Sequence, residues 1–280
     1  MQELPESTFF ELTRHDAVVE VSMNRPKKAN GMSVDFWTEL PAIMTALDKD
    51  MSVRSVVLTG AGKNFTGGMD LAVFQGLMGM LQSEPGRAAY EMRQNVLKYQ
   101  RTFNALEDTR LPVIAAIQGA CIGGGIDMIS ACDIRLASAD AYFAIEEINI
   151  GMTADVGTLQ RLPKAMPLGI VTELALTGRR FSADEAHGWH MINAVHSDAE
   201  AVRTAALEMA ADIASKSPLA VAGVKKSVTF ARDHSVADGL EQIATWNGGM
   251  LRPEDLMAAM QARMAKTEAV FADLLNSSAA

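Results

Sequence analysis

The sequence predicts an α/β protein with a largely parallel β-sheet and a helical C-terminal region. Over roughly residues 1–198, short β-branched and apolar runs alternate with segments of helical periodicity, which is typical of βα units around a parallel sheet. From about Ala199 onward the strand pattern stops and only helical periodicity remains. We therefore predict a core domain in residues 1–198 and a helical region in residues 199–280.

The first part of the core contains two predicted strands and one predicted helix. Val18–Met23 alternates like a strand, and it ends at Arg25-Pro26 because proline cannot donate to a sheet ladder. Ser33 can cap a helix with one apolar face that ends near Leu47. Residues 53–59 form a β-branched run stopped by glycine, which indicates a buried strand.

The second part of the core repeats this pattern. A long helix is expected over residues 87–106, and a buried strand over Val113–Ile117 follows Pro112. Gly123-Gly124-Gly125 then begins a helix, and residues 134–137 return as a strand. In the C-terminal region, Ser217-Pro218 has the composition of a helix start.

Composition and charge limit the classes of function. The chain has 280 residues, 49% hydrophobic and 21% charged, as expected of a globular protein. Its net charge of −9 and the lack of a basic run argue against a nucleic-acid partner. Its apolar runs are too short to span a membrane, and its first residues lack a secretory signal. Two cysteines are too few for a disulfide framework, so we predict a cytoplasmic protein.

Two glycine-bearing loops each follow a predicted buried strand. They are residues 65–70 and Gly123-Gly124-Gly125. A loop of this kind presents unpaired backbone N–H groups, and glycine lets a ligand approach them closely. One such loop alone is more commonly just a tight turn. Together they allow two N–H donors to converge on one carbonyl oxygen, which would stabilise an enolate.

Three carboxylates occur in apolar sequence near or after the second loop: Asp127, Glu147 and Asp155. Apolar surroundings disfavour the charged carboxylate and raise its pKa towards the range useful for proton transfer. A structural role is an equally open interpretation of all three. Asp127 could cap its own helix, Glu147 could face solvent, and Asp155 could cap a helix that begins at Gly157.

Several motifs resemble those of the crotonase superfamily, the enoyl-CoA hydratases and isomerases, over roughly residues 10–270. They are Asn24-Arg25-Pro26, Val57-Leu58-Thr59-Gly60, Phe65-Thr66-Gly67-Gly68-Met69-Asp70-Leu71 and Ile117-Gln118-Gly119-Ala120-Cys121-Ile122-Gly123-Gly124-Gly125. Within that superfamily the segments GGGIDMISACD (123–133), ADVGTLQRLP (154–163) and TWN (245–247) are most similar to the Δ3,5-Δ2,4-dienoyl-CoA isomerases. The resemblance implies a crotonase-like spiral of ββα units with a helical C-terminal trimerisation region, assembled as a homotrimer or homohexamer.

The same resemblance implies a role for each matching position. The backbone N–H groups of Met69 and Gly124 would form the oxyanion hole for the thioester oxygen. Asp155 would take a proton from C2, Glu147 would give one to C6, and Asp127 would be the third catalytic carboxylate. The positions implied to bind the CoA substrate are Arg25, Lys27, Lys28, Ala29, Asn30, Gly67, Gly68, Asp70, Leu71 and Gly123, with Lys225 and Lys226 as further phosphate partners.

Isomerisation of a 3,5-dienoyl-CoA in fatty acid β-oxidation is the function that these residues imply. One alternative is an enoyl-CoA hydratase, although hydratases carry glutamate where Asp127 stands and a small or apolar residue where Asp155 stands. A catalytically inactive scaffold or RNA-binding protein is the second alternative. No cofactor is expected, since coenzyme A is part of the substrate. No metal is expected either, because no carboxylate shares the spacing of His187 and His190.

Overall fold

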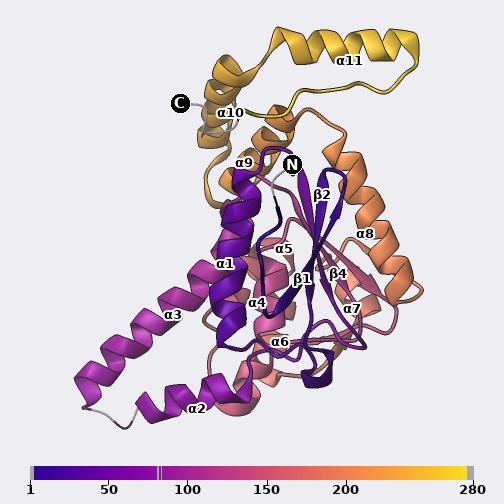
Figure 1. Ribbon diagram of the computed structural model, residues 1–280. Helices are drawn as coiled ribbons and strands as arrows, with labels where there is room; N and C mark the ends of the chain where they lie inside the picture. The colour runs from indigo at the N-terminus through magenta and orange to yellow at the C-terminus, as the bar shows by residue number, and fades with distance from the viewer. Residues whose placement is uncertain (1–2, 81, 83, 276–280) are drawn as a thin grey trace.

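A six-stranded sheet forms the centre of the computed structural model, which describes residues 3–80, 82 and 84–275 (Figure 1). Its strands lie in the order β1-β2-β3-β4-β6-β9, and every neighbouring pair is parallel except β1 with β2. The strands are β1 (Phe10–His15), β2 (Val18–Met23), β3 (Ser55–Gly60), β4 (Val113–Ile117), β6 (Ile134–Ser138) and β9 (Ala194–His196). The predicted α/β class with a largely parallel sheet is confirmed.

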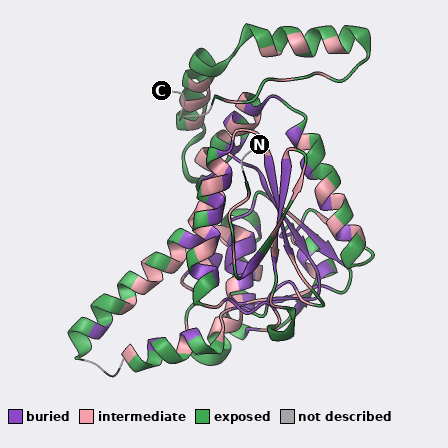
Figure 2. Cartoon of the chain, in the orientation of Figure 1, coloured by how far each residue is buried: buried purple, intermediate pink, exposed green. Residues whose placement is uncertain are grey.

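Helices cover both faces of this sheet, so its strands are buried on both sides. In β3, Val56 and Leu58 belong to the larger apolar core, whereas Val57 lies in a second cluster on the opposite face. This alternation follows from the two-residue period of a strand. The second cluster is completed by helix α8 (Ala199–Ala214), which presents Val202, Ala206, Ala210 and Ala214 at four-residue spacing. Figure 2 shows the sheet as the most continuously buried part of the chain.

A second, three-stranded sheet supports the candidate active site. Its strands are β5 (Ala120–Ile122), β7 (Tyr142–Ala144) and β8 (Phe181–Ser182), in the order β5-β7-β8. Because β5 and β7 are parallel, the segments that follow them leave the same edge of the sheet side by side. One of these segments begins with Gly123 and the other contains Glu147.

The remaining helices form the outer layers and two projections, except α4, which is largely buried in the core. They are α1 (Val34–Lys49), α2 (Leu71–Met80), α3 (Pro85–Asp108), α4 (Gly124–Ser130), α5 (Thr158–Ala165), α6 (Leu168–Thr177), α7 (Ala183–Gly188), α9 (Pro218–Asp233), α10 (Val236–Met250) and α11 (Pro253–Ala265), with the 3₁₀ helices η1 (Pro26–Lys28) and η2 (Glu146–Ile150). Figure 1 shows α2 and α3 extending from one end of the molecule and α10 and α11 from the other. Across the described residues, no helix has the length and apolar character of a membrane span.

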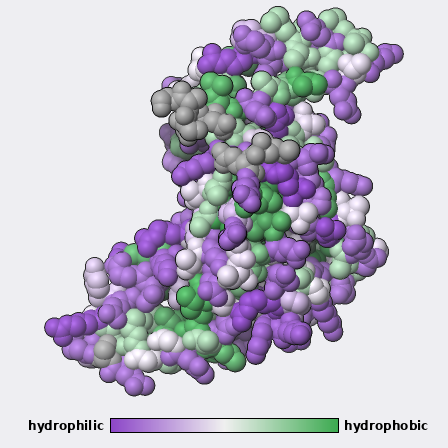
Figure 3. All heavy atoms as spheres, viewed as in Figure 1, coloured by the Kyte–Doolittle hydropathy of each residue, from purple (hydrophilic) through white to green (hydrophobic). Residues whose placement is uncertain are grey.

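The C-terminal helices differ in how they contact the core. Helix α8 packs on the sheet, so it shares a core with residues that precede the predicted boundary at residue 198. Helix α9 contacts α10, where the ring of Trp246 lies against Gly223. No residue of α10 or α11 is buried. In Figure 3 apolar and hydrophilic side chains are mixed on this projection. The division at residue 198 stays a prediction.

Most of the expected elements occur close to their expected bounds, and the differences have local causes. Helix α1 follows Ser33, but the Ser33 side chain caps no backbone group. Helix α2 was not predicted, because its glycines and methionines give weak helical periodicity. The short strands β5, β7 and β8 were also not predicted, since two or three residues carry too little pattern to identify a strand.

Candidate active site

The loop between β3 and α2 presents the backbone N–H of Met69. The residues on either side of Met69 pair with Met32: the Met32 N–H donates to the Gly68 carbonyl at 2.8 Å, and the Asp70 N–H donates to the Met32 carbonyl at 3.1 Å. These two bonds fix the backbone around Met69. The Met69 N–H points away from Met32. Among the described residues, nothing accepts a hydrogen bond from that amide. It is therefore available to a ligand.

A second available amide comes from the N-terminus of α4. Gly124 is the first residue of this helix, so its N–H has no partner within the helix. The two loops are in contact, since a Cβ built on Gly68 would lie 3.7 Å from the Gly124 nitrogen. Gly68 has a φ of 85°, and the same Cβ would lie 2.9 Å from the Ile122 carbonyl oxygen. Only glycine allows the loops to approach in this way, and their contact brings the two predicted oxyanion-hole residues together.

Asp127 points from α4 to the N-terminus of another helix. Its carboxylate Oδ1 accepts a hydrogen bond from the Thr158 N–H at 2.7 Å, and its exposed fraction is 1%. Burial raises the pKa of Asp127 to about 6, although the Thr158 hydrogen bond opposes this shift. Asp127 therefore caps α5 instead of its own helix, and it connects the helix after the second glycine loop to the segment that carries Asp155.

Glu147 is placed beside the second glycine loop by the parallel pairing of β5 and β7. A Cβ on Gly123 would lie 3.3 Å from the Glu147 Oε1 atom, and the Gly123 N–H donates to the Ala144 carbonyl at 3.0 Å. The Glu147 Oε2 atom is buried and accepts no hydrogen bond from any described residue. Burial, reinforced by the charge of Asp127, raises the pKa of Glu147 to about 7. The alternative of a solvent-facing glutamate is thus wrong.

Asp155 lies in the loop between η2 and α5 and is half-buried. Burial raises its pKa, and its negative charge contributes to the raised pKa of Glu147. The N-cap of α5 is Gly157, and no side chain bonds to the helix from that position. Asp155 is therefore not a helix cap, and its carboxyl group remains free for chemistry. The three predicted carboxylates form one group of electrostatically coupled acids.

Because the pKa of Glu147 is raised, replacing Glu147 with an uncharged residue is expected to stabilise the folded protein in a pH-dependent way. Between its ordinary pKa of 4.5 and about 7, the folded protein binds more protons at this group than the unfolded chain does. The contribution of Glu147 to stability therefore falls as pH rises through this window. Glu147→Gln is expected to raise the free energy of unfolding at pH 8 by about 2 kcal/mol. The difference in the free energy of unfolding between Glu147→Gln and the starting protein should disappear below pH 4.5.

Urea unfolding at pH 4.5 and pH 8 measures this effect. Glu208→Gln, at an exposed position on α8, is the control, and its free energy of unfolding should differ little from that of the starting protein at either pH. A Glu147→Gln protein no more stable than the starting protein at pH 8 would contradict the assigned burial of this carboxyl group.

Several of the predicted CoA-binding residues make structural contacts in this loop region. The Arg25 guanidinium pairs with the Asp70 carboxylate at 3.0 Å and donates to the Gly31 carbonyl. The buried Asn30 side chain donates to three carbonyl groups of the β3–α2 loop: those of Ala61, Asn64 and Phe65. These contacts order the loop that carries Met69. Their assignment to CoA stays a prediction.

The other predicted CoA-binding positions differ in exposure. Lys27, Lys28 and Leu71 are exposed, and Ala29 accepts a hydrogen bond from Gly67 at 2.7 Å. Lys225 is a correction: its ammonium group is buried and donates to Leu106, Leu111 and Asp133. It has no free donor for a phosphate. The sequence pattern of a lysine pair could not distinguish this buried lysine from its exposed neighbour Lys226.

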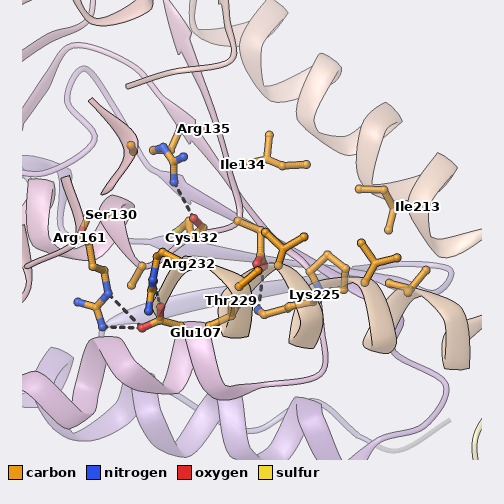
Figure 4. Close-up of a pocket in the computed structure, with 18 of the residues that line it drawn as sticks. Glu107, Ser130, Cys132, Ile134, Arg135, Arg161, Ile213, Lys225, Thr229 and Arg232 are labelled. Atoms are coloured by element: carbon orange, nitrogen blue, oxygen red, sulfur yellow. Dashed lines mark hydrogen bonds and ion pairs between the residues drawn. The ribbon is translucent and has the colours of Figure 1, made fainter. Parts of the chain in front are cut away.

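A cavity of about 860 Å³ is lined mainly by residues of α9, of α5 and of the segment that follows α4 (Figure 4). Its lining contains none of the three catalytic candidates. Sequence reasoning missed Gln100 and Thr158, which contact the candidate site from α3 and α5. Gln100 lies in no motif, and although Thr158 lies in the segment ADVGTLQRLP, its contact with Asp127 depends on helix packing.

Comparisons with known proteins agree with this geometry. The family model described as enoyl-CoA hydratase/isomerase matches residues 13–273. The mitochondrial Δ(3,5)-Δ(2,4)-dienoyl-CoA isomerase of Mus musculus is 46% identical over 90% of this chain and 77% of its own length. The peroxisomal enzyme of that name from Arabidopsis thaliana is 41% identical over 92% of this chain and 94% of its own. A crystal structure of an enoyl-CoA hydratase from Bacillus anthracis superposes with a TM-score of 0.86 at 30% identity, covering 94% of this chain and 99% of that one.

These similarities confirm the predicted crotonase-like fold and correct the predicted location. The dienoyl-CoA isomerases that are 41–46% identical to this chain are named as mitochondrial or peroxisomal proteins. The cytoplasmic location expected from the sequence is therefore wrong. That expectation rested on cysteine number and on the composition of the first residues, and neither property distinguishes the cytosol from another reducing compartment.

Proposed function

Since this chain belongs to the enoyl-CoA hydratase/isomerase family, we propose that it converts 3,5-dienoyl-CoA to 2,4-dienoyl-CoA in fatty acid β-oxidation. The observation that carries the proposal is the group of three coupled carboxylates beside two free backbone amides. Two amides can hold a thioester oxygen, and two separate acids can act on distant carbons of one conjugated chain. A hydratase, in contrast, needs only two carboxylates that hold one water molecule, so a third carboxylate favours the isomerase.

The reaction moves one proton off the substrate and one on. Asp155 removes a proton from C2, and the electron pair spreads through the conjugated chain to the thioester oxygen. The Met69 and Gly124 amides stabilise the negative charge on that oxygen. Glu147 then donates a proton to C6, so that double bonds form at C2–C3 and C4–C5. Asp155 ends protonated and Glu147 ionised, and proton exchange between them or with solvent restores the starting state.

The electrostatics support this division of roles. A pKa of about 7 keeps a large fraction of Glu147 protonated at neutral pH, as a proton donor requires. Asp155 is half-buried, burial also raises its pKa, and the proposal gives it the proton-accepting role at C2. Asp127 holds the N-terminus of α5 and raises the pKa of Glu147 by its charge. It thus helps to keep Glu147 in the acid form.

The test is an ultraviolet assay with 3,5-octadienoyl-CoA, run beside crotonyl-CoA hydration on the same preparation. The proposal predicts the absorbance of a new 2,4-dienoyl thioester, with weak hydration. Strong hydration without dienoyl turnover would favour a hydratase, and CoA-ester binding without either activity would favour a scaffold. Either result would overturn the proposed function.

The substrate is an acyl-CoA, and the proposed reaction needs no cofactor or metal, since it involves only proton transfer. The homotrimer or homohexamer stays a prediction. It is supported by the C-terminal projection, where α10, α11 and the residues between them expose apolar side chains without a core of their own: Leu240, Met250, Leu251, Leu256, Met257, Met260 and Met264. An exposed apolar surface of this kind favours contact with another protein chain.

A further inference from the structure

One face of α3 holds the segment that carries Asp155. Gln100, Asn104 and Glu107 are spaced by four and three residues, so they lie on one stripe of the helix. Gln100 Nε2 donates to the Asp155 carbonyl oxygen at 2.7 Å. Asn104 Oδ1 accepts from Arg161 Nη2 at 2.8 Å, and Glu107 pairs with the same guanidinium at 2.9 Å. All three contacts go to residues 155–161.

The contacts further along this stripe make it a rigid support. Arg161 is largely buried, with 11% of its side chain exposed, and its guanidinium lies over Gly157, where a Cβ would be 2.0 Å from Nη1. Glu107 also pairs with Arg232 of α9, so that one carboxylate joins two arginines from different helices (Figure 4). Charge-assisted bonds of this kind are shorter and stronger than neutral ones. The α5 end of the segment is thereby held at several points.

The Asp155 end of the segment is held by the burial of its neighbours Ala154 and Val156 in the core and by one side-chain hydrogen bond to the backbone of Asp155 itself. The loop from Gly151 to Gly157 has little regular structure, and the Gln100 amide is the side-chain donor that holds the Asp155 backbone. The carbonyl that accepts this hydrogen bond and the carboxyl group belong to the same residue. A rotation of the Asp155 backbone would therefore move the carboxyl group as well. Small displacements of a proton-transfer group lower its rate steeply.

We propose that Gln100 is a positioning residue for Asp155: its hydrogen bond to the Asp155 carbonyl aims the carboxyl group at C2 of the substrate. This inference rests on the proposed function, in which Asp155 is the C2 base. Gln100 itself touches no reacting atom. It acts by fixing the backbone from which the base projects, while Asn104 and Glu107 fix the other end of the same segment through Arg161.

Gln100→Leu tests the proposal, because leucine has a similar volume and cannot donate. The expected result is a 10- to 100-fold lower kcat for 3,5-octadienoyl-CoA, with KM changed less than threefold and the acidic limb of the kcat–pH profile shifted. Gln94→Leu is the matched control, since Gln94 is exposed on the same helix, and it should leave kcat, KM and the pH profile unchanged. If Gln100→Leu does not fold, Gln100→Asn keeps the amide on a side chain one methylene shorter and takes its place.

A double-variant cycle separates this proposal from the proposed function. If Gln100 acts through Asp155, adding Gln100→Leu to Asp155→Asn should lower the residual kcat no further. A lowered melting temperature with unchanged kcat and pH profile in Gln100→Leu would overturn the positioning role. Full additivity of the two changes would overturn it too. If the unaltered protein fails to convert the dienoyl substrate at all, the proposed function fails instead.

Discussion

Replacing Asp155 with asparagine is expected to lower kcat for 3,5-dienoyl-CoA isomerisation by about 10³-fold, the usual worth of a positioned general base. The amide has nearly the shape of the carboxylate but cannot accept the C2 proton. KM should change little, because the proposed mechanism has the Met69 and Gly124 amides hold the thioester. Stopped-flow or steady-state absorbance of the 2,4-dienoyl product measures the loss.

Asp184→Asn is the control for this experiment, since Asp184 is exposed on α7 and far in sequence from the site. It should retain full activity. An Asp155→Asn protein that isomerises at the normal rate would exclude Asp155 as the base. If such a protein also hydrated crotonyl-CoA in a reaction dependent on Asp127 and Glu147, the hydratase alternative would gain direct support.

Replacing Gly68 with alanine is expected to lower kcat by about 10²- to 10³-fold, the loss seen when one oxyanion-hole donor is removed. At a φ of 85°, an alanine here is strained, and its Cβ would lie 2.9 Å from the Ile122 carbonyl oxygen. Relief of this contact must separate the two glycine loops. The Met69 and Gly124 amides would then no longer converge on one oxygen.

Gly76→Ala is the matched control, because Gly76 lies in α2 and a Cβ there meets no atom within 4 Å. The control should keep full activity, and its helix should be slightly stabilised. Circular dichroism checks that Gly68→Ala still folds, and the dienoyl assay measures its turnover. A normal kcat in a folded Gly68→Ala protein would show that the Met69 and Gly124 amides do not form the oxyanion hole.

The sequence alone was sufficient for four strands of the main sheet, β2, β3, β4 and β6, and for the types of residue in the site. Strands such as Val18–Met23 and Val113–Ile117 are buried runs whose pattern depends only on local side chains, and they occur where expected. The glycine loops and the three acids were also identifiable, because free amides and apolar-flanked carboxylates have a local signature. Their roles, however, came from resemblance to a family.

Only the tertiary structure decided what each polar group contacts. Asp127 could have capped its own helix on sequence grounds, yet it caps α5, thirty-one residues away. Arg25 and Lys225 look alike as possible phosphate partners, but one pairs with Asp70 and the other is buried against Asp133. The choice depends on which charges the folded chain brings within a few ångströms, and burial strengthens such interactions.

The protonation states of the carboxyl groups in the site likewise could not be predicted from the sequence. A glutamate in the run Glu146-Glu147 carries no sign of its pKa, which rises to about 7 only because β5 and β7 place Glu147 beside Gly123, out of water and near Asp127. Gln100 has no motif at all and becomes part of the site through the packing of α3. Local pattern determined which groups this protein possesses. Long-range packing determined their distances, and the distances set the chemistry.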